Sequence, residues 1–431
     1  MERLGAAYWR LWSANAVSYV GDGALVTALP LYAVTVTRDP RLISLVSAAM
    51  FIPWLVLSLP AGAIVDRNDR GTLMWRSQAF QLVVIAALAA GVATRHAGIA
   101  VLTVGGLLLG SAEVFFSNAA QSVLPQLVPA GLLPRANGNQ QVVQTIGETF
   151  AGPPLGSWLF AVRAALPFGL DALSFAGSAA LLATLPRTRA TPTRQPVPAA
   201  EPVPAGELAS VGEPASARNP VPMRAQIAEG VRWLARHRLL RCVAVLLGVA
   251  NFTSQMGQAT LVLLATQALH TGTSGYGLLW TASAVGSVLG GVVNPVVTRR
   301  LGLISSMVVS GCAFAVLYAG TGLSPDFAVA ATLMACNGFF ITMWNIVTVT
   351  LRQTIVPVEL LGRVNSAYRM IGWGPLPLGA LAGGFIAHAI GLRAPYIIGG
   401  LLMAAGLLAA APVLRSAARS TRVQGAVDEV Q

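Results

Sequence analysis

Long apolar runs alternate with short polar segments along almost the whole chain. Each run holds about 20 or more mostly apolar residues, which is the length of α-helix that crosses a bilayer. Six runs precede a long polar gap and six follow it, over residues 12–36, 43–65, 72–94, 98–123, 138–161, 166–186, 240–268, 275–297, 302–322, 326–350, 364–390 and 393–414. The pattern predicts an all-α membrane protein with twelve transmembrane helices.

Composition strengthens this interpretation. Hydrophobic residues make up 55% of the chain and charged residues only 10%, against about 25% charged in a soluble domain. The net charge of +12 would otherwise raise the question of nucleic acid, but all 28 basic residues are arginines that cluster between apolar runs. This arrangement is typical of a membrane protein, so we expect no nucleic-acid partner. The three cysteines show no metal-ligand spacing and no nucleotide-binding GxxxxGK[ST] motif occurs. We therefore expect no metal and no cofactor.

The arginines also predict an orientation. With both termini in the cytoplasm, thirteen arginines fall on the inner side of the predicted spans and five in the outer loops. Cytoplasmic loops carry such an excess of basic residues. We therefore expect a multi-pass protein of the cytoplasmic (inner) membrane with both termini cytoplasmic.

The polar gap divides the chain into parts. Residues 1–186 form the predicted N-terminal six-helix half, and residues 240–415 the C-terminal half, followed by a cytoplasmic tail over 416–431. Residues 187–223 are rich in proline and small polar residues, which predicts a disordered cytoplasmic linker. Residues 224–239 predict a basic amphipathic cytoplasmic helix that lies against lipid headgroups, or serves only as a solvated start of the seventh span.

An internal repeat relates the two halves. A shift of 228 residues places VPAGLLPRAN (128–137) on VPVELLGRVN (356–365), with six of ten positions identical. Two pseudo-repeated six-helix halves indicate a secondary transporter whose site lies between the halves near mid-membrane.

Four segments carry a resemblance to a known family: GAIVDRNDRG (62–71), AGPPLG (151–156), LDALSF (170–175) and EGVRWLARHRLLR (229–241). The chain resembles the major facilitator superfamily of transporters, and within it the drug-exporter branch that contains macrolide and enterobactin exporters. The resemblance implies two sets of functional residues. One is a cytoplasmic gate motif of Gly62, Asp66, Arg67 and Arg70, and the other is an antiporter-type motif of Gly147, Gly152, Pro153 and Gly156.

Each motif also has a plainer interpretation. The arginines of the first satisfy the basic-inside pattern without any gate, and the prolines of the second could simply kink a helix at a crossing. The sequence departs from many drug/proton antiporters in one respect, because the fourth span carries Glu113 and no arginine.

Acidic residues inside predicted spans are candidates for proton coupling, because a charge at membrane depth is costly. These are Asp22, Glu113 and Glu148. The alternative for each is a hydrogen-bonded structural acid between helices. Asp171 stands near the outer end of its span, so we expect a gate or helix-capping group there.

Polar and aromatic residues within the spans predict a cavity for a bulky, largely apolar solute. The candidates are Asn15, Ser18, Gln141, Gln144, Asn251, Gln255, Trp280, Asn337, Asn345 and Arg369. Amides in such positions also serve as contacts between helices without binding a solute.

These features predict a secondary active transporter and not an enzyme. We expect proton-coupled efflux of a hydrophobic drug, antibiotic or siderophore-like metabolite by alternating access, in a protein that functions as a monomer. Its partners are then a small-molecule substrate, protons as the coupling ion and the lipid bilayer. Two alternatives remain open: an importer or facilitator of a small metabolite, and a transport-dead membrane sensor.

Overall fold

The computed structural model describes residues 4–185, 223–357, 360, 364, 368 and 370–428. All regular structure in these residues is helical, as predicted. The first part of the chain holds α1 (Ala6–Val36), α2 (Pro40–Arg67), α3 (Arg70–Ala93), α4 (Ile99–Leu127), η1 (Ala130–Leu132), α5 (Leu133–Gln144), η2 (Thr145–Ala151), α6 (Gly152–Val162) and α7 (Leu166–Ala183). The second holds α8 (Met223–Arg236), α9 (Arg238–Gln258), α10 (Leu261–Leu263), η3 (Leu264–Ala268), α11 (Thr273–Leu301), α12 (Leu303–Leu323), α13 (Phe327–Ile355), α15 (Pro375–Ala389) and α16 (Ala394–Asp428).

Eleven helices in the described residues are long and apolar enough to cross a membrane. The predicted fifth span, 138–161, is the exception, because it is divided into α5, the π-helix η2 and α6. Pro153 and Pro154 lack the amide hydrogens that an α-helix needs, and the amide of Gly152, just before them, bonds to the carbonyl of Gly147 five residues back. The twelve-helix prediction holds once this interrupted rod is counted as one crossing.

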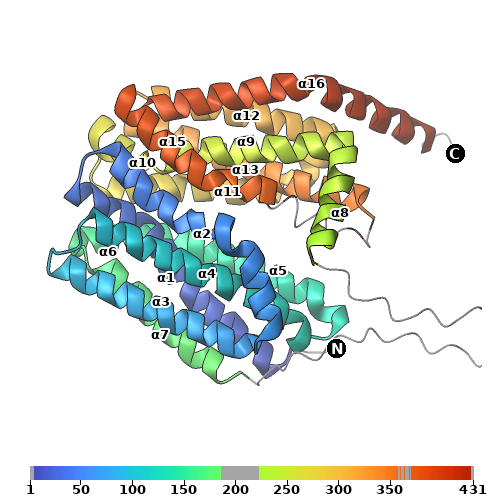
Figure 1. The fold of residues 1–431 in the computed structure, drawn as a ribbon. Coiled ribbons are helices and arrows are strands. Elements are labelled where there is room, and N and C mark those ends of the chain that lie inside the picture. The colour runs from blue at the N-terminus through green and yellow to red at the C-terminus, as the bar shows by residue number, and fades with distance from the viewer. Residues whose placement is uncertain are drawn as a thin grey trace, which may run out of the picture.

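The helices form two bundles, with α1–α7 in one and α8–α16 in the other (Figure 1). In the first, α1 packs against both α6 and α7, and α3 lies between α4 and α7. In the second, α9 packs against α15 and α16, and α12 against α13 and α16. The central position of α1 places its polar residues inside the first bundle.

The boundaries of α8 and of the last helix are among those that differ from the predicted ones. The amphipathic helix α8 ends at Arg236 and not at 239, because the His237 side chain accepts a hydrogen bond from the amide of Leu240 and caps α9. The last helix continues to Asp428, past the predicted span end at 414. The predicted linker lies outside the described residues, except for Met223, which begins α8.

The two bundles touch mainly at the end that holds Asp39, called here the Asp39 end. There a nitrogen of His388 in α15 lies 3.5 Å from a carboxylate oxygen of Asp39, and Gly384 packs on Ser44. Nearer the middle, the rings of Trp54 and Trp373 lie 5.2 Å apart. At the opposite end, called here the Arg70 end, Figure 1 shows α8 and the ends of α2 and α4 spread apart.

Candidate functional site

The polar face of α1 is buried in the first bundle and linked to neighbouring helices. Asn15 Nδ2 donates a hydrogen bond to Gln140 Oε1 at 3.0 Å, and Ser18 Oγ donates to Asp22 Oδ2 at 3.1 Å. Gln78 Nε2 in α3 donates to Ser18 Oγ at 3.4 Å. The predicted shared face of Asn15, Ser18 and Asp22 is therefore present, and it contacts both α3 and α5.

Glu113 and Glu148 are each held by one amide donor. Gln81 Nε2 donates to Glu113 Oε2 at 3.2 Å, and Gln144 Nε2 lies 3.2 Å from both carboxylate oxygens of Glu148. Both acids are partly buried, as is Asp22. No salt bridge to these three acids occurs within the described part of the chain, so their charge is not balanced there by an arginine or histidine.

A fourth acid, Asp171, lies near the start of α7, as expected, but in an enclosed environment. Its side chain has no exposed surface, and Oδ1 accepts a hydrogen bond from Ser174 Oγ at 3.2 Å while Oδ2 is buried without a hydrogen-bond partner. It faces the backbone of α1 at Gly21, where any side chain would overlap the Asp171 carboxylate and the Ser174 hydroxyl. Asp171 on α7 is thus an enclosed acid that lies against Gly21, the residue before Asp22 on α1. Its described side-chain hydrogen bond, from Ser174 Oγ, caps no helix.

Sequence reasoning named Asp171 but not as an enclosed acid against α1, and it missed Gln78 and Gln81, both buried on α3. A signal for Asp171 was available, since Asp171, Ser174 and Ser178 recur at i, i+3 and i+7 and so share one face of α7. No comparable pattern marks Gln78 and Gln81, whose roles depend on the contact of α3 with α1 and α4.

The glycines of the antiporter-type motif face α1. A side chain at Gly147 would overlap Tyr19 and Val20, one at Gly152 would overlap the backbone of Gly23, and one at Gly156 would overlap Ala24. The carbonyl of Pro153 accepts a hydrogen bond from Thr27 Oγ1 at 3.1 Å. This close crossing brings the backbone of Glu148 against Gly23, beside Asp22.

The predicted gate motif lies at the Arg70 end. Arg70 Nη1 donates to the carbonyl of Ser122 in α4 at 3.1 Å, and Asp69 caps α3 by accepting from the amide of Thr72 at 2.7 Å. Arg67 is exposed and Gly62 partly buried. The side chain of Asp66 lies outside the described residues. The described contacts of Arg70 therefore join α3 to α4 within one bundle.

The remaining cavity candidates do not form a single group. Asn251 and Asn345 line one pocket in the second bundle, whereas Gln255, Trp280 and Asn337 do not line it. Trp280 Nε1 and Asn337 Oδ1 are buried without hydrogen-bond partners. Gln141 is exposed, and its Nε2 donates a hydrogen bond to Thr145 Oγ1 at 3.4 Å. Arg369 lies outside the described residues.

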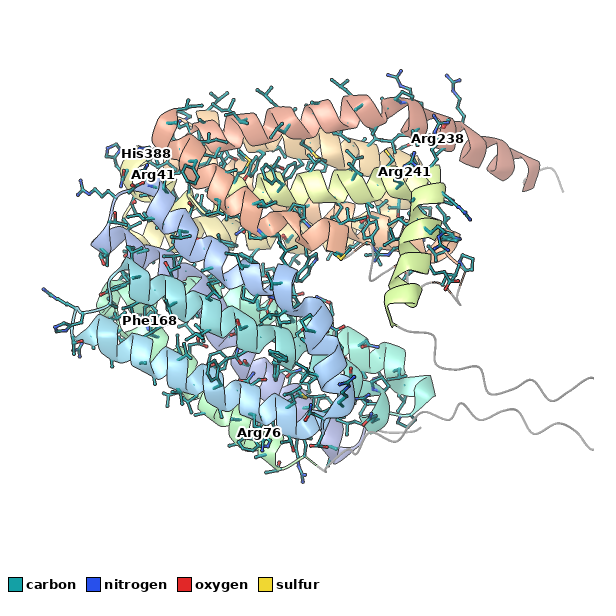
Figure 2. All side chains as sticks on the ribbon, in the orientation of Figure 1. Arg41, Arg76, Phe168, Arg238, Arg241 and His388 are labelled. Carbon is teal, nitrogen blue, oxygen red and sulfur yellow. The ribbon has the colours of Figure 1, made fainter. Side chains whose placement is uncertain are left out.

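Arginine side chains lie toward both ends of the bundles. Figure 2 shows Arg41 beside His388 at the Asp39 end, and Arg76, Arg238 and Arg241 toward the other end. Arg41 forms a bidentate pair with Asp39, with Nη2 2.8 Å from Oδ2 and Nε 3.2 Å from Oδ1, and these hydrogen bonds lower the pKa of Asp39 to about 2.

Comparison with known proteins gives the family. The model of the Major Facilitator Superfamily matches residues 11–374. An uncharacterized MFS-type transporter of Bacillus subtilis (strain 168), YfiS, is 24% identical over 411 residues, covering 91% of this chain and 89% of that protein. Macrolide efflux protein A of Streptococcus pyogenes is 27% identical over 160 residues, covering 36% of this chain and 38% of that protein.

Solved structures show the same fold. The crystal structure of a mutant of the nucleoside transporter NupG superposes with a TM-score of 0.72 at 13% sequence identity, covering 94% of this chain and 98% of that one. The chain belongs to the Major Facilitator Superfamily. It is a multi-pass membrane transporter of small molecules and not an enzyme, and its resemblance to the drug-exporter branch is confirmed.

Proposed function

We propose that the protein is a proton-coupled exporter of hydrophobic small molecules that works by alternating access. The observation that carries this proposal is the set of acids Asp22, Glu113 and Glu148 in mid-helix, each bonded to a neutral donor. A carboxylate at bilayer depth without a cation costs several kcal/mol, and binding a proton removes that cost. Because these acids are partly exposed, protons can reach them.

Asp22 is the first choice for the coupling residue. It lies on α1, which contacts α5, α6 and α7, and it follows Gly21, against which the enclosed Asp171 carboxyl group lies. Like charges disfavour each other, so a proton gained or lost at Asp22 changes the energy of its neighbours as well. The antiporter-type motif contacts α1 closely at Gly23. A proton gained or lost at Asp22, the neighbouring residue, therefore acts on that motif.

The arginine distribution supports an orientation in which the Arg70 end is cytoplasmic, along with both termini, in the inner membrane. The described contacts between the bundles lie mainly at the Asp39 end, which in this orientation supports a state closed to the outside. Asp66, Arg67 and Arg70 then have the role of closing the cytoplasmic side in the opposite state. We propose that the protein functions as a monomer.

The substrate class follows from chemistry and likeness together. The candidate residues of the second bundle are amides and aromatics, which suit an uncharged or weakly charged apolar solute. A relative named for macrolide efflux matches about a third of the chain, which supports an antibiotic of that kind as the first compound to test.

The decisive experiment uses inverted membrane vesicles with an imposed proton gradient. Erythromycin should accumulate in vesicles with wild-type protein and a protonophore should abolish the accumulation. The Asp22→Asn variant should lose at least about tenfold of the gradient-dependent rate, as expected when a proton carrier is removed. The matched control is Asp326→Asn, because Asp326 only caps α13 and asparagine caps equally well.

The alternatives predict other results. A facilitator would move substrate down its gradient in the presence of the protonophore and in Asp22→Asn. An importer would accumulate substrate in right-side-out vesicles instead. A transport-dead sensor would show no movement of any compound, with or without the gradient.

A further inference from the structure

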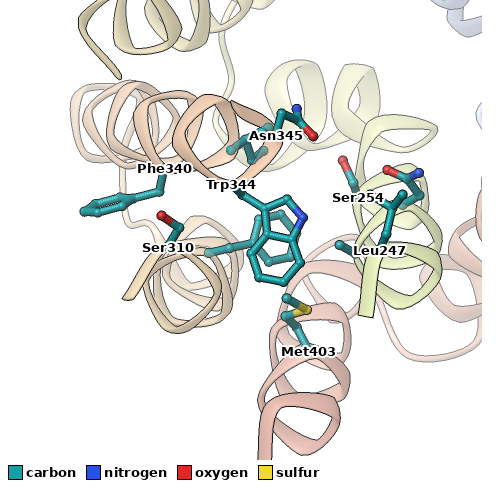
Figure 3. Close-up of a pocket in the computed structure, with 11 residues that line it drawn as sticks. Leu247, Ser254, Ser310, Phe340, Trp344, Asn345 and Met403 are labelled. Carbon is teal, nitrogen blue, oxygen red and sulfur yellow. The ribbon is translucent and has the colours of Figure 1, made fainter. Parts of the chain in front are cut away.

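A pocket inside the second bundle lies between α9, α12, α13 and α16 (Figure 3). Its volume is about 60 Å³, and the residues that matter most for its chemistry are Asn251, Ser254, Ser310, Phe314, Trp344 and Met403. A buried water needs about 10–15 Å³ of such space. The pocket therefore has room for a substituent of a few atoms but not for a bulky solute as a whole.

Trp344 gives the pocket its unused hydrogen-bond donor. The residue is only 5% exposed, and its Nε1 is buried without a hydrogen-bond partner. The indole nitrogen of tryptophan can only donate, so an acceptor is needed to satisfy it. Figure 3 shows the indole between Ser310 on one side and Ser254 and Leu247 on the other, with its nitrogen on the Ser254 side.

Three polar side chains that line the pocket already make hydrogen bonds of their own. Ser310 Oγ donates to the carbonyl of Ser306 at 2.8 Å, and Ser254 Oγ accepts from Gln258 Nε2 at 3.1 Å. Asn251 Nδ2 donates to the carbonyl of Gly372 at 2.7 Å. A buried unsatisfied donor is costly in a native structure, which indicates that an additional molecule supplies the acceptor.

The lining excludes a charged ligand group. None of the described residues that line the pocket is charged, and Phe314, Phe340, Trp344 and Met403 provide apolar and aromatic surface. Gly311 of α12 leaves room for the indole ring, because a Cβ there would lie 3.0 Å from Trp344. The pocket is therefore shaped for a neutral apolar group that has one acceptor atom.

We propose that this pocket binds an uncharged apolar substituent of the transported molecule, with Trp344 Nε1 donating a hydrogen bond to its ether or carbonyl oxygen. The proposal rests on the proposed export function and adds the chemistry by which a substrate is selected. The pocket holds one end of the solute, and the rest of the solute extends past Asn345, which borders the pocket and is exposed.

The test observes the indole directly. The full-length protein is labelled with ¹⁵N-tryptophan and placed in lipid nanodiscs, and the Trp344 signal is assigned by its loss in Trp344→Phe. Erythromycin, whose lactone and ether oxygens are acceptors, is then added. We expect the Trp344 N–H signal to move downfield as the hydrogen bond forms, while the signal of Trp158, exposed on α6, stays unchanged.

Binding of radiolabelled erythromycin gives the second measurement. Trp344→Phe keeps the apolar ring but removes the donor, so affinity should fall about 3- to 10-fold. The matched control Trp158→Phe should bind like the wild type. A Trp344 signal that stays in place while erythromycin binds would assign the pocket to water and overturn the proposal, as would unchanged affinity in Trp344→Phe or no binding to the wild type.

Failure of the export function is distinguishable from failure of this proposal, because binding is measured without a gradient. A shifted Trp344 signal with no energised transport would contradict only the export function. Transport with an unmoved Trp344 signal would contradict only the pocket.

Discussion

At the scale of single residues, the contact between Gly21 and Asp171 shows how an uncompensated acid is accommodated. Asp171 has no exposed surface, and the absence of a side chain at Gly21 lets its carboxyl group lie directly against α1. Neighbouring Ser174 supplies the one hydrogen bond at 3.2 Å. The space at Gly21 is thus required by the acid opposite it.

Adding a methyl group at this position tests that requirement. We expect Gly21→Ala to lower the free energy of unfolding by about 1–3 kcal/mol, the usual cost of overpacking, measured as a fall in Tm in detergent. Gly21→Ala combined with Ser174→Ala should recover part of the loss, since the Ser174 hydroxyl is one of the groups that the methyl meets. The control is Gly169→Ala in α7, where a Cβ meets nothing within 4 Å. Equal stability of Gly21→Ala and wild type would contradict the described contact.

At the scale of elements, the fifth crossing is the part of the fold that hydrophobic patterning describes least well. Patterning detects apolar residues at membrane length, and it placed one helix over 138–161. It does not register which amide hydrogens are missing, so the π-helix at Thr145–Ala151 came only from the structure. The interruption is local: Gln141 bonds to Thr145, where the π-helix begins, and Gln144 bonds to Glu148 inside it.

Restoring the amide hydrogens that Pro153 and Pro154 lack should slow transport without lowering the stability of the protein. Pro153→Ala with Pro154→Ala supplies two amides and favours a continuous α-helix, since an interior proline costs a helix about 3 kcal/mol. We expect an equal or higher Tm together with at least about tenfold slower gradient-driven transport, because Glu148 would rotate away from Asp22. Unchanged transport would show that the π-helix has no part in the cycle. Pro167→Ala, at the first turn of α7, is the matched control.

At the scale of the whole molecule, the sequence predicted the helices and their family far better than the contacts between them. Apolar runs, arginine clusters and the 228-residue repeat are properties of the chain itself. Asp171, Gln78 and the pocket around Trp344 depend on which helix faces which, and that is decided by packing between residues up to a hundred or more positions apart. Asn15 and Ser18 were found because they share a helix face with Asp22.

The contact between Asp39 and His388 leads to a prediction about the alternation of the two bundles. The hydrogen bonds from Arg41 lower the pKa of Asp39 to about 2, so its charged form contributes stability above the ordinary value near 4, and this contribution is lost only as the pH falls through about 2. Asp39 is therefore ionised throughout the physiological range. Nδ1 of His388 lies 3.5 Å from the Asp39 carboxylate, so this carboxylate joins α15 to the start of α2.

Loss of the Asp39 charge should therefore weaken closure at the Asp39 end. In Asp39→Asn the contact that joins α15 to the start of α2 loses its carboxylate, and Arg41 loses its ion-pair partner. Because the pair is exposed, the ratio of closed to open molecules should fall only about 1.5- to 5-fold. Spin labels at Val36→Cys and Ile390→Cys, in a variant without Cys242, Cys312 and Cys336, report this ratio by distance distributions. Asp326→Asn is the matched control, and an unchanged ratio in Asp39→Asn would contradict a role of this contact in closure.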